Sequence, residues 1–416
     1  MARLLTICHY ELLPIRGGGA LRSFHLLRQL AREHEVHAII FQREAELRRE
    51  TEGYKVPDSV RIYSPIDHPP PASVFDRLPR RLGPGLHYRW LRRSWRGPAS
   101  ADVLRCHHLI RRILGEHQID AVIFEYVGIL GAASLIRRLS PRTRRILNAH
   151  NVDHKLYAQQ LASRYGQTIP DRERRILAQT KWMEENLGSF VHNFWACSDR
   201  DRTALQALSG LGGFTIQNGI DTATRPFDPN PAKAQIKTLL FCGSLSYAPN
   251  LNGLEWFRKE VWPQLREADS SVRLRIIGSG ARPDHYAELR ADSTVEFLGE
   301  VDTVLPHYCR SGVCIVPLLE GSGTRLKLLE AMSLGNPVVS TRIGAEGIEA
   351  SDGEHILLAD DPNAFTSAIL RLLHEPITFN NMRRAARRLV EARYDWALIG
   401  DRMNAALKLC CKTPAP

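Results

Sequence analysis

Short apolar runs alternate with longer helical patterns along almost the whole chain, and this alternation constrains the fold more than any other feature. In the first half, runs such as RLLTIC and RRILNAH are expected to be strands beginning at residues 3, 35, 119, 144 and 193. In the second half, runs such as VRLRIIGSG and VCIVPLL are expected to begin at residues 237, 272, 295, 313 and 336. Continuous apolar strands separated by helices are typical of parallel sheets covered on both faces. Two such series predict an α/β chain with two doubly wound domains.

The boundary between the two domains is expected within QNGIDTATRPFDPNPAKA, because Pro, Asp, Asn and Gly cluster there without a period. This assigns residues 1–218 to an N-terminal domain and residues 219–394 to a C-terminal domain. A leucine-rich helix is predicted for 395–412, after the second domain has ended, and it is free to pack back on the first. The length of 416 residues suits two domains of ordinary size.

The formal net charge of +11 is unevenly distributed. Residues 1–220 hold 33 Lys and Arg against 21 Asp and Glu, whereas residues 221–416 hold 23 against 24. The first half therefore carries the whole excess of positive charge. Such asymmetry favours an anionic partner for that half, such as a membrane surface, a nucleic acid or a phosphorylated acceptor.

The eight cysteines are scattered and form no C-x-x-C pair. We therefore expect reduced thiols in a cytoplasmic protein, and no zinc site. No apolar run approaches the ~18 residues of a membrane-spanning helix. The first residues, MARLLTICHY, are interpreted as a strand and not as a signal peptide.

The stretch EGSGTRLKLLEAM, residues 320–332, joins an expected strand to an expected helix through a glycine-spaced loop. Gly321 and Gly323 allow backbone N–H groups to approach a ligand closely, with Ser322 between them. Thr324 is the expected cap of the helix. Because the free N–H groups at a helix start attract anions, this loop is a candidate phosphate site.

Arg325 and Lys327 place two cations at this helix start, where cations are unfavourable for the helix dipole. An anion such as a pyrophosphate between them and the helix reverses that effect, and the fork of Arg suits phosphate oxygens. Glu330 follows on a neighbouring face and can accept hydrogen bonds from a ribose diol. The alternative is a solvated helix with a surface Lys–Glu pair, since glycine-rich loops before helices are common.

Pieces of the second half occur in an order that resembles glycosyltransferase family 4, the group 1 glycosyltransferases of GT-B fold. They are FCGSL, IIGSG, FLGEV, VPLLEGSGTRLKLLEAMSLGNPVVST and GIEASDGEHILLADDPNAF, within residues 238–365. LPIRGGGALRSFHLLRQLA and NGID are looser matches in the first half. The resemblance implies two Rossmann-like domains that face each other across a cleft. The first would bind the acceptor and the second the sugar nucleotide.

The resemblance also implies that Glu330 is the ribose-binding glutamate of the family's E-x7-E motif. The other glutamate of that motif falls on Ser322, and Glu320 lies ten residues from Glu330. Whether Glu320 or Ser322 replaces the missing glutamate stays open. Backbone N–H groups from Gly321 to Thr324 are expected to help hold the donor sugar.

Many members of the family place phosphate-binding cations after the strand that corresponds to LLFCGSL, but SYAPNLNG follows here without a cation. We therefore expect Arg325 and Lys327 to bind the phosphates of the donor instead. Gly243 and Ser244, at the end of this strand, are also assigned to the donor site.

A second glycine loop, Gly17, Gly18 and Gly19, follows the first strand and precedes a helix expected from about residue 20. This loop suits close approach of the acceptor or of the donor phosphates. It does not have the G-x-G-x-x-G pattern, and the alternative is a flexible loop. His150 would lie at the carboxyl end of a strand, facing the cleft of an open sheet. The resemblance implies contact with the donor sugar, with Asp153 as a second candidate. The alternative is a satisfied loop histidine.

Asp199 and Asp201 form an Asp-x-Asp pattern, which is the metal motif of a different glycosyltransferase fold. Because they follow a strand and open a helix, we interpret them as cap and dipole partners. No metal ion and no other cofactor is expected.

Residues 77–112 contain ten arginines and one acidic residue. Within them, LHYRWLRRSWR separates an aromatic arc from an arginine arc at about 100° per residue. Such a helix suits a membrane interface with anionic lipid, and its candidate contacts are Arg89, Trp90, Arg92, Arg93, Trp95 and Arg96. The alternative is a helix that packs its apolar arc on its own domain.

These features predict a retaining glycosyltransferase that moves a sugar from a nucleoside-diphosphate sugar to a glycan or lipid-linked acceptor. We expect it to act in surface polysaccharide or glycolipid biosynthesis, on the inner face of the plasma membrane, with His150, Arg325 and Lys327 as catalytic residues. One alternative is a sugar-nucleotide epimerase of GT-B fold, which needs no acceptor. Another is a non-catalytic protein that binds an anionic polymer. No nucleic-acid partner is expected, because no helix-turn-helix, zinc or aromatic RNA motif is present.

Overall fold

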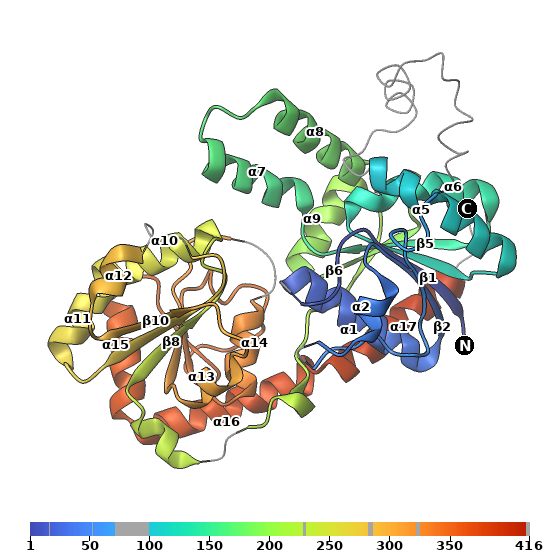
Figure 1. Ribbon diagram of the computed structural model, residues 1–416. Coiled ribbons are helices and arrows are strands. Elements are labelled where there is room, and N and C mark those ends of the chain that lie inside the picture. The colour runs from blue at the N-terminus through green and yellow to red at the C-terminus, as the bar shows by residue number, and fades with distance from the viewer. Residues whose placement is uncertain are drawn as a thin grey trace. The chain divides into compact units, whose positions relative to one another are not determined.

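The computed structural model describes residues 1–15, 17–51, 53–70, 100–227, 230–281, 286–321 and 325–412. The chain divides into two compact units, of which one comprises Met1–Ile216 with the C-terminal residues from Gly400, and the other Gln217–Ile399. Each unit is a parallel sheet covered by helices on both faces (Figure 1). The predicted α/β fold with two doubly wound domains is confirmed.

The sheet of the first unit has seven strands in the order β3-β2-β1-β4-β5-β6-β7. All neighbouring strands run parallel. The strands are β1 (Arg3–Cys8), β2 (Glu35–Ile40), β3 (Arg61–Tyr63), β4 (Ala121–Glu125), β5 (Arg144–Ala149), β6 (Asn193–Ala196) and β7 (Gly213–Thr215).

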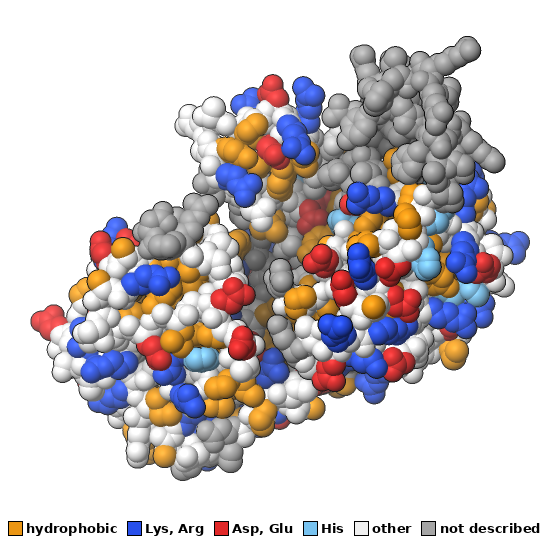
Figure 2. Space-filling model, in the orientation of Figure 1, with side chains coloured by type: hydrophobic (Ala, Val, Ile, Leu, Met, Phe, Trp, Pro, Cys, Tyr) orange, Lys and Arg blue, Asp and Glu red, His pale blue; other side chains and the backbone are white. Residues whose placement is uncertain are grey.

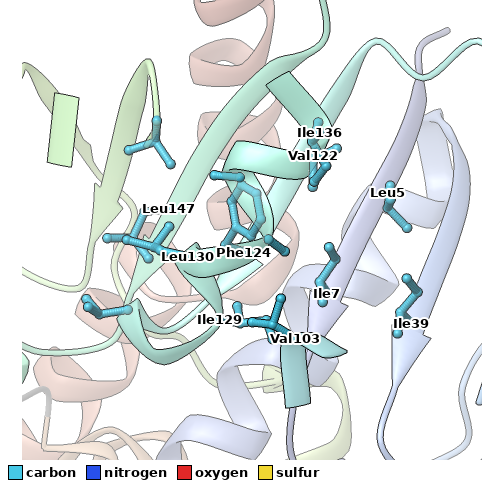
Figure 3. Close-up of a cluster of buried hydrophobic side chains, with 14 of the residues drawn as sticks. Leu5, Ile7, Ile39, Val103, Val122, Phe124, Ile129, Leu130, Ile136 and Leu147 are labelled. Carbon is cyan, nitrogen blue, oxygen red and sulfur yellow. The ribbon is translucent and has the colours of Figure 1, made fainter. Parts of the chain in front are cut away.

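The helices of the first unit include one from the far end of the chain. They are α1 (Gly18–Glu33), α2 (Glu44–Arg48), α5 (Ser100–Glu116), η1 (Val127–Ala132), α6 (Ala133–Leu139), α7 (Asp153–Tyr165), α8 (Asp171–Glu185), η2 (Leu187–Ser189), α9 (Asp199–Ser209) and α17 (Trp396–Lys412). From Gly400 onward, α17 packs beside α1, where Asn404 Oδ1 lies 3.2 Å from His34 Nε2. The main apolar core of the unit lies between α5, η1 and one face of the sheet (Figure 3).

The sheet of the second unit has six parallel strands in the order β10-β9-β8-β11-β12-β13. They are β8 (Thr238–Cys242), β9 (Arg273–Ile277), β10 (Val295–Gly299), β11 (Val313–Val316), β12 (Val338–Ser340) and β13 (Leu357–Leu358). The helical elements are η3 (Thr222–Thr224), η4 (Pro231–Gln235), α10 (Ala248–Trp256), η5 (Phe257–Val261), α11 (Trp262–Ala268), α12 (Ala287–Ala291), α13 (Leu305–Cys309), α14 (Leu326–Ser333), α15 (Pro362–His374) and α16 (Pro376–Arg393).

Side chains of the second sheet alternate between two apolar cores, one on each face. On β8, Leu239 and Phe241 join the core beneath α10, α11 and α15, and Leu240 joins the core beneath α14 and α16. On β11, Ile315 joins the core beneath α10, α11 and α15, and Val316 joins the core beneath α14 and α16. Successive residues of a strand point to opposite faces, so a strand buried on both faces must be apolar throughout. This explains the continuous apolar runs in the sequence.

Every strand expected from the sequence is present, and three further strands were missed. The missed strands β3, β7 and β13 are two or three residues long and lie at sheet edges. An edge strand pairs on one side only and needs no long apolar run, so its sequence carries a weak signal.

The helical pattern of NLNGLEWFRKEVWPQLREA, residues 250–268, does not form one continuous α-helix. α10 and α11 are separated by a π-helical segment, Phe257–Val261. Pro263 lies in the first turn of α11. Proline has no amide N–H to donate to the carbonyl four residues before it, which explains why the regular ladder breaks just ahead of it.

In both sheets the strand order reverses beside the first strand of the unit. The chain proceeds from β1 to β2 and β3 on one side, and then to β4 on the other. In the second unit it proceeds from β8 to β9 and β10, and then to β11. In open parallel sheets, ligands bind at the carboxyl ends of the two strands that flank such a reversal. The loops after β1 and β4, and those after β8 and β11, are therefore the places where a site is expected.

The loop after β9 approaches the loop after β8 so closely that it requires a glycine. Gly278 has φ +155°, and a Cβ atom there would lie 1.8 Å from the carbonyl oxygen of Gly243. Its N–H group donates to the carbonyl of Gly299, 2.7 Å away. Gly299 also has a positive φ, +69°, but a Cβ there would meet nothing within 4 Å.

We expect Gly278→Ala to destabilise the protein by about 3 kcal/mol or more, because an unfavourable φ adds to a clash with a rigid backbone. Gly299→Ala carries the backbone cost alone, about 1–2 kcal/mol, and is the matched control. Urea-induced unfolding of the intact chain measures both. Equal stability of the two variants would contradict the argument.

Candidate functional site

The strand reversal of the second unit brings β8 and the start of α14 together. Gly243 directly follows β8, and a Cβ there would lie 2.8 Å from Lys327 Nζ and 3.0 Å from Asn250 Nδ2. A glycine is thus needed for these two side chains to approach the strand end. The next predicted donor residue, Ser244, is exposed, and its hydroxyl lies 3.1 Å from that of Ser246.

Helix α14 begins later than predicted. Its first residue is Leu326, so Arg325, and not Thr324, occupies the N-cap position. The backbone of Arg325, with φ −81° and ψ 75°, is outside the helical region. Ser322, Gly323 and Thr324 lie outside the described residues, so their contacts with a donor stay predictions.

Arg325 is almost completely buried at the end of the loop. It is 5% exposed, and its guanidinium group donates to the carbonyl of Ile343, 3.3 Å away. Gly321, with φ +118°, lies against this group, because a Cβ there would be 3.2 Å from Arg325 Nη1. The loop therefore holds the arginine head group between its own backbone and that of Ile343.

Lys327 is held by polar and aromatic neighbours. Its Nζ donates to Asn250 Oδ1 at 2.7 Å and lies 4.8 Å from the ring centroid of Phe241. Asn250 Nδ2 donates in turn to the carbonyl of Ser244 at 2.8 Å, which joins the helix start to the loop after β8. Burial, together with the charge of Arg325, lowers the pKa of Lys327 to about 8. The negative charge of a bound anion would raise the pKa of Lys327 again. The cationic form of Lys327 therefore favours the binding of an anion at this place.

Glu330 does not form the surface pair with Lys327 that was the alternative interpretation. Its carboxylate is 3.0 Å from Arg225 Nε, and both side chains are largely buried, at 18% and 21% exposure. The backbone of Arg225 is also fixed, because its carbonyl accepts from Arg387 of α16 at 2.5 Å. Sequence reasoning missed Arg225 because it lies 105 residues from its partner.

Glu320, one of two candidates to replace the missing glutamate of the motif, is engaged by α10. Its Oε1 accepts from Asn252 Nδ2 at 2.7 Å in an exposed contact. The other candidate, Ser322, is outside the described residues, so the choice between them stays open.

In the first unit, two of the three loop glycines belong to the helix. α1 begins at Gly18, two residues before the expected start, and Gly17 is its N-cap. A Cβ on Gly19 would lie 2.1 Å from Tyr126 Oη and 3.4 Å from His150 Nδ1, whereas one on Gly17 would meet nothing within 4 Å. Gly19 is therefore required by close packing, which brings the start of α1 next to His150.

His150 follows β5 and is 5% exposed. Its Nε2 lies 2.9 Å from Glu125 Oε2, and the ring of Tyr126 stacks on it at a centroid distance of 3.9 Å. Burial lowers the pKa of His150 despite the nearby carboxylate. A neutral imidazole that donates from Nε2 to Glu125 leaves Nδ1 as an acceptor, and this buried atom has no hydrogen-bond partner among the described residues.

Glu125, at the end of β4, is the centre of a buried polar network. Its Oε2 accepts from Ser23 at 2.5 Å and from Asn148 at 2.9 Å, besides the bond to His150. Burial raises the pKa of Glu125, but the bonds from His150, Ser23 and Asn148 outweigh it and hold the pKa below its ordinary value. Arg22 donates to Asn148 Oδ1 at 2.7 Å, which joins α1 to the network.

Glu125 was missed from the sequence, although a signal was present. It is an acidic residue at the end of an apolar strand, and the next strand along the chain ends in His150. Carboxyl ends of neighbouring parallel strands meet at one edge of a sheet, so the two side chains are expected to meet.

Tyr126, the next residue, has a positive φ of 71° and is the one non-glycine residue with positive φ in the described part of the chain. Such a conformation costs on the order of 1–3 kcal/mol and persists only when the surroundings hold it. Here the N–H of Tyr126 donates to the carbonyl of Asn148 at 3.3 Å, and the ring stacks on His150. Strained residues of this kind cluster at functional sites.

A cavity of about 610 Å³ opens at this edge of the sheet, beside the network. Its walls come from the loop after β1, the start of α1, η1, and the helices α7 and α8. Figure 1 shows α7 and α8 extending together away from the sheet. The cavity thus lies at the strand reversal of the first unit, where a ligand site is expected.

Asp153, at the start of α7, lines the cavity. Burial, and then the charge of Glu184, raise the pKa of Asp153 to about 7. Glu184 of α8 is itself buried and takes the place of a helix cap, because its carboxylate accepts from the N–H groups of Asp153 at 2.6 Å and His154 at 3.2 Å. α8 therefore fixes the start of α7 and, with it, Asp153.

The Asp-x-Asp pattern lies in the first turn of α9, as expected, but the prediction that its aspartates cap the helix is wrong. The cap is the hydroxyl of Ser198, which accepts from the N–H of Asp201 at 3.1 Å. Asp199 accepts from Arg202 and from Thr215, at 3.2 and 2.6 Å. In the described ranges, no group of three or more His, Cys, Asp and Glu side chains is placed to hold a metal ion.

The predicted membrane segment, with Arg89, Trp90, Arg92, Arg93, Trp95 and Arg96, lies outside the described residues, so its role stays a prediction. On the face drawn in Figure 2, Lys and Arg side chains are interspersed with Asp and Glu. None of the described helices is both long and apolar enough to cross a bilayer.

Two family models match consecutive parts of the chain. Residues 16–224 match the model described as Glycosyltransferase Family 4, and residues 236–375 match the model described as Glycosyl transferases group 1.

Individual proteins match more weakly. The glycogen synthase of Mycobacterium tuberculosis is 26% identical over 238 residues, which are 54% of this chain and 55% of that protein. The phosphatidyl-myo-inositol mannosyltransferase of Mycobacterium leprae is 27% identical over 231 residues, 53% of this chain and 59% of that protein. The chain thus spans a little over half the length of these relatives.

A solved structure of HepE from Anabaena, in complex with UDP and glucose, matches with a TM-score of 0.66 at 13% identity. The match covers 98% of this chain and 100% of that one. It shows likeness of fold.

The raised pKa of Asp153 makes stability depend on pH. Between about pH 4 and pH 7 the folded state keeps a proton that the unfolded state has lost, so this group's contribution to stability falls as the pH rises. Asp153→Asn removes the titration. We expect the melting temperature of the variant, relative to the parent, to rise by a few degrees from pH 5 to pH 8. About 1 kcal/mol corresponds to about 2–4 °C in a domain of this size.

Melting curves at the two pH values test this, with the exposed Asp171→Asn as a control whose difference from the parent should stay constant. A constant difference for Asp153→Asn as well would contradict the assignment.

Proposed function

The chain belongs to glycosyltransferase family 4, the group 1 glycosyltransferases, and from this we propose that it transfers a sugar with retention from a nucleoside-diphosphate sugar to a glycan or lipid-linked acceptor. It is an enzyme of the hexosyltransferase type. The observation that carries the proposal is the pair of cations, Arg325 and Lys327, at the start of α14, where the strand order of the second sheet reverses.

The proposed donor site uses the groups at that reversal. The pyrophosphate binds Arg325 and Lys327, and the ribose binds Glu330, whose carboxylate Arg225 already orients. Gly243 and Gly321 support this arrangement, because a Cβ atom at either position would lie close to the head group of Lys327 or Arg325, at 2.8 and 3.2 Å respectively.

The proposed chemistry follows from the two cations. The bond between the anomeric carbon and the phosphate oxygen breaks, and negative charge develops on the leaving diphosphate. Arg325 and Lys327 stabilise that charge, and they are fixed before the reaction begins, so little reorganisation is required. The acceptor hydroxyl oxygen forms the new bond to the anomeric carbon, and its proton passes to the leaving phosphate. No step in this scheme is assigned to a metal ion.

His150 keeps its predicted role of contacting the transferred sugar. In support, its Nδ1 is a buried acceptor without a partner in the described part of the protein. A sugar hydroxyl is a donor of the kind that such an atom lacks.

The acceptor and the cellular setting are also proposals. We propose a glycan or lipid-linked acceptor in surface polysaccharide or glycolipid biosynthesis, at the inner face of the plasma membrane. The names of the two relatives, a glycogen synthase and a phosphatidyl-myo-inositol mannosyltransferase, support a glycan and a lipid-linked acceptor respectively.

Removal of either cation should slow the reaction. We expect Arg325→Ala and Lys327→Ala each to lower kcat by about ten- to a thousand-fold, by analogy with other lost transition-state donors. Lys259→Ala, which removes an exposed cation paired with Glu255, is the control and should keep full activity. Near-normal turnover of both site variants would overturn the assignment. Product formed without any acceptor would favour the epimerase instead.

The ribose contact of Glu330 can be tested by binding. A ligand that binds the folded state raises its melting temperature by mass action. In a panel of UDP-, GDP-, ADP- and dTDP-sugars, at least one ribonucleotide sugar should raise the melting temperature, and its 2′-deoxy analogue should do so less. Glu330→Gln should remove this difference, whereas the exposed Glu354→Gln should not. A shift that is the same in Glu330→Gln and the parent would contradict the site.

A further inference from the structure

We propose that the cavity of the first unit is the subsite for an uncharged sugar ring of the acceptor, with Asp153 as the group that accepts its hydroxyl hydrogen bonds. The inference rests on the proposed function in that it calls the ligand an acceptor. The cavity, its lining and its charge are independent of the donor site.

The walls of the cavity are aromatic on several sides. Tyr10, Tyr126 and Tyr157 all line it. Tyr10 and Tyr126 meet edge to face, with ring centroids 5.4 Å apart. Aromatic rings offer large apolar faces with few rotatable bonds, so they bind a ligand at a small entropic cost. The C–H face of a pyranose ring is a suitable partner for such walls.

These rings are already held in place. The hydroxyl of Tyr10 forms a hydrogen bond with Ser23, and that of Tyr157 donates to Glu173 of α8. Tyr126 is fixed by its stacking on His150. Since each ring is fixed by another group, its conformation does not depend on the ligand. The cavity is therefore preorganised for a rigid, ring-shaped ligand.

The charge of the cavity decides which sugar fits. The charged groups among its described lining residues are carboxylic, Glu11 and Asp153, and no Lys or Arg is among them. Above its pKa of about 7 Asp153 is ionised, and a sugar phosphate, a sulfated sugar or a uronic acid would then place a second negative charge beside it, with no counter-ion among the described lining residues. The hydroxyl groups of a neutral sugar are hydrogen-bond donors, which a carboxylate binds well.

The position of Asp153 is set by the protein. Glu184 holds the first N–H groups of α7, and a short hydrogen bond joins Glu184 to His154. Asp153 therefore cannot move away without breaking a buried contact between α7 and α8. This makes it a suitable anchor for orienting a ring against the tyrosines.

The cavity adjoins the polar network of the unit. One face of Tyr126 contacts His150, and the same tyrosine lines the cavity. A ring bound there would contact Tyr126, which separates it from His150, the residue proposed to contact the transferred sugar. The volume of about 610 Å³ suits one or two rings, and the remainder of an acceptor chain would extend outside.

The test is saturation-transfer NMR on the intact protein at about pH 8, above the pKa of Asp153, with simple probes. These are the methyl α-pyranosides of glucose, mannose and galactose, compared with methyl glucuronide and glucose 6-phosphate. We expect at least one neutral glycoside to bind, and the two anionic probes to bind about tenfold more weakly or not at all. Equal binding of an anionic probe, or no binding of any neutral glycoside, would overturn the proposal.

Variants locate the binding. Tyr157→Ala and Asp153→Asn should each weaken the neutral glycoside about tenfold, while Tyr157→Phe, which keeps the ring, should retain it. Gln159→Ala, on the exposed side of α7, is the matched control. Unchanged binding in both Tyr157→Ala and Asp153→Asn would place the glycoside elsewhere and contradict the proposal.

The nucleotide panel separates this inference from the proposed function. If the parent binds no nucleotide sugar but binds neutral glycosides in the cavity, the transferase assignment fails and the sugar subsite stands. If nucleotide sugars bind and the glycosides do not, the reverse holds. Tyr157→Ala should leave the nucleotide-induced shift unchanged.

Discussion

Both candidate sites depend on one topological constraint, the reversal of strand order beside the first strand of each sheet. At that place two neighbouring strands send their chains to opposite sides, and the loops after them leave space above the sheet edge. In the first unit the space lies above β1 and β4 and is lined by Tyr126, which stacks on His150 of the buried Glu125 network. In the second unit the corresponding place lies above β8 and β11, and Arg325 and Lys327 lie there.

Charged groups at these places are balanced by fixed groups of the protein. Glu125 stays ionised in a buried position because three donors converge on one of its oxygens. Lys327 is buried close to a second cation, Arg325, so its pKa falls although an amide oxygen and an aromatic ring contact it. The charge of Glu125 is balanced by protein groups alone, whereas the charge of Lys327 gains from an added anion. This difference in balance is a physical reason to place the phosphate groups in the second unit.

The sequence allowed the strands, their parallel arrangement and the cation-bearing helix start to be predicted, because each depends on residues that are close in the chain. The short edge strands were not predicted, because they depend on pairing with a neighbouring strand. The π-helical segment before Pro263 was not predicted either, because it depends on the N–H group that proline lacks. The partners of the site residues were the hardest to predict. Asn250 and Arg225 lie far along the chain from Lys327 and Glu330, and only the folded sheet brings them together.

The pair formed by Arg225 and Glu330 bears on how such enzymes can be recombined. Arg225 lies in neither of the two segments that match family models, 16–224 and 236–375, and Arg387, which holds its carbonyl, lies outside both as well. A module excised at the limits of the second match would carry the glutamate without its arginine. A chimaera that exchanges sugar-nucleotide specificity between relatives therefore needs its crossover points before Arg225 and after α16, so that the carboxylate travels with its counter-ion.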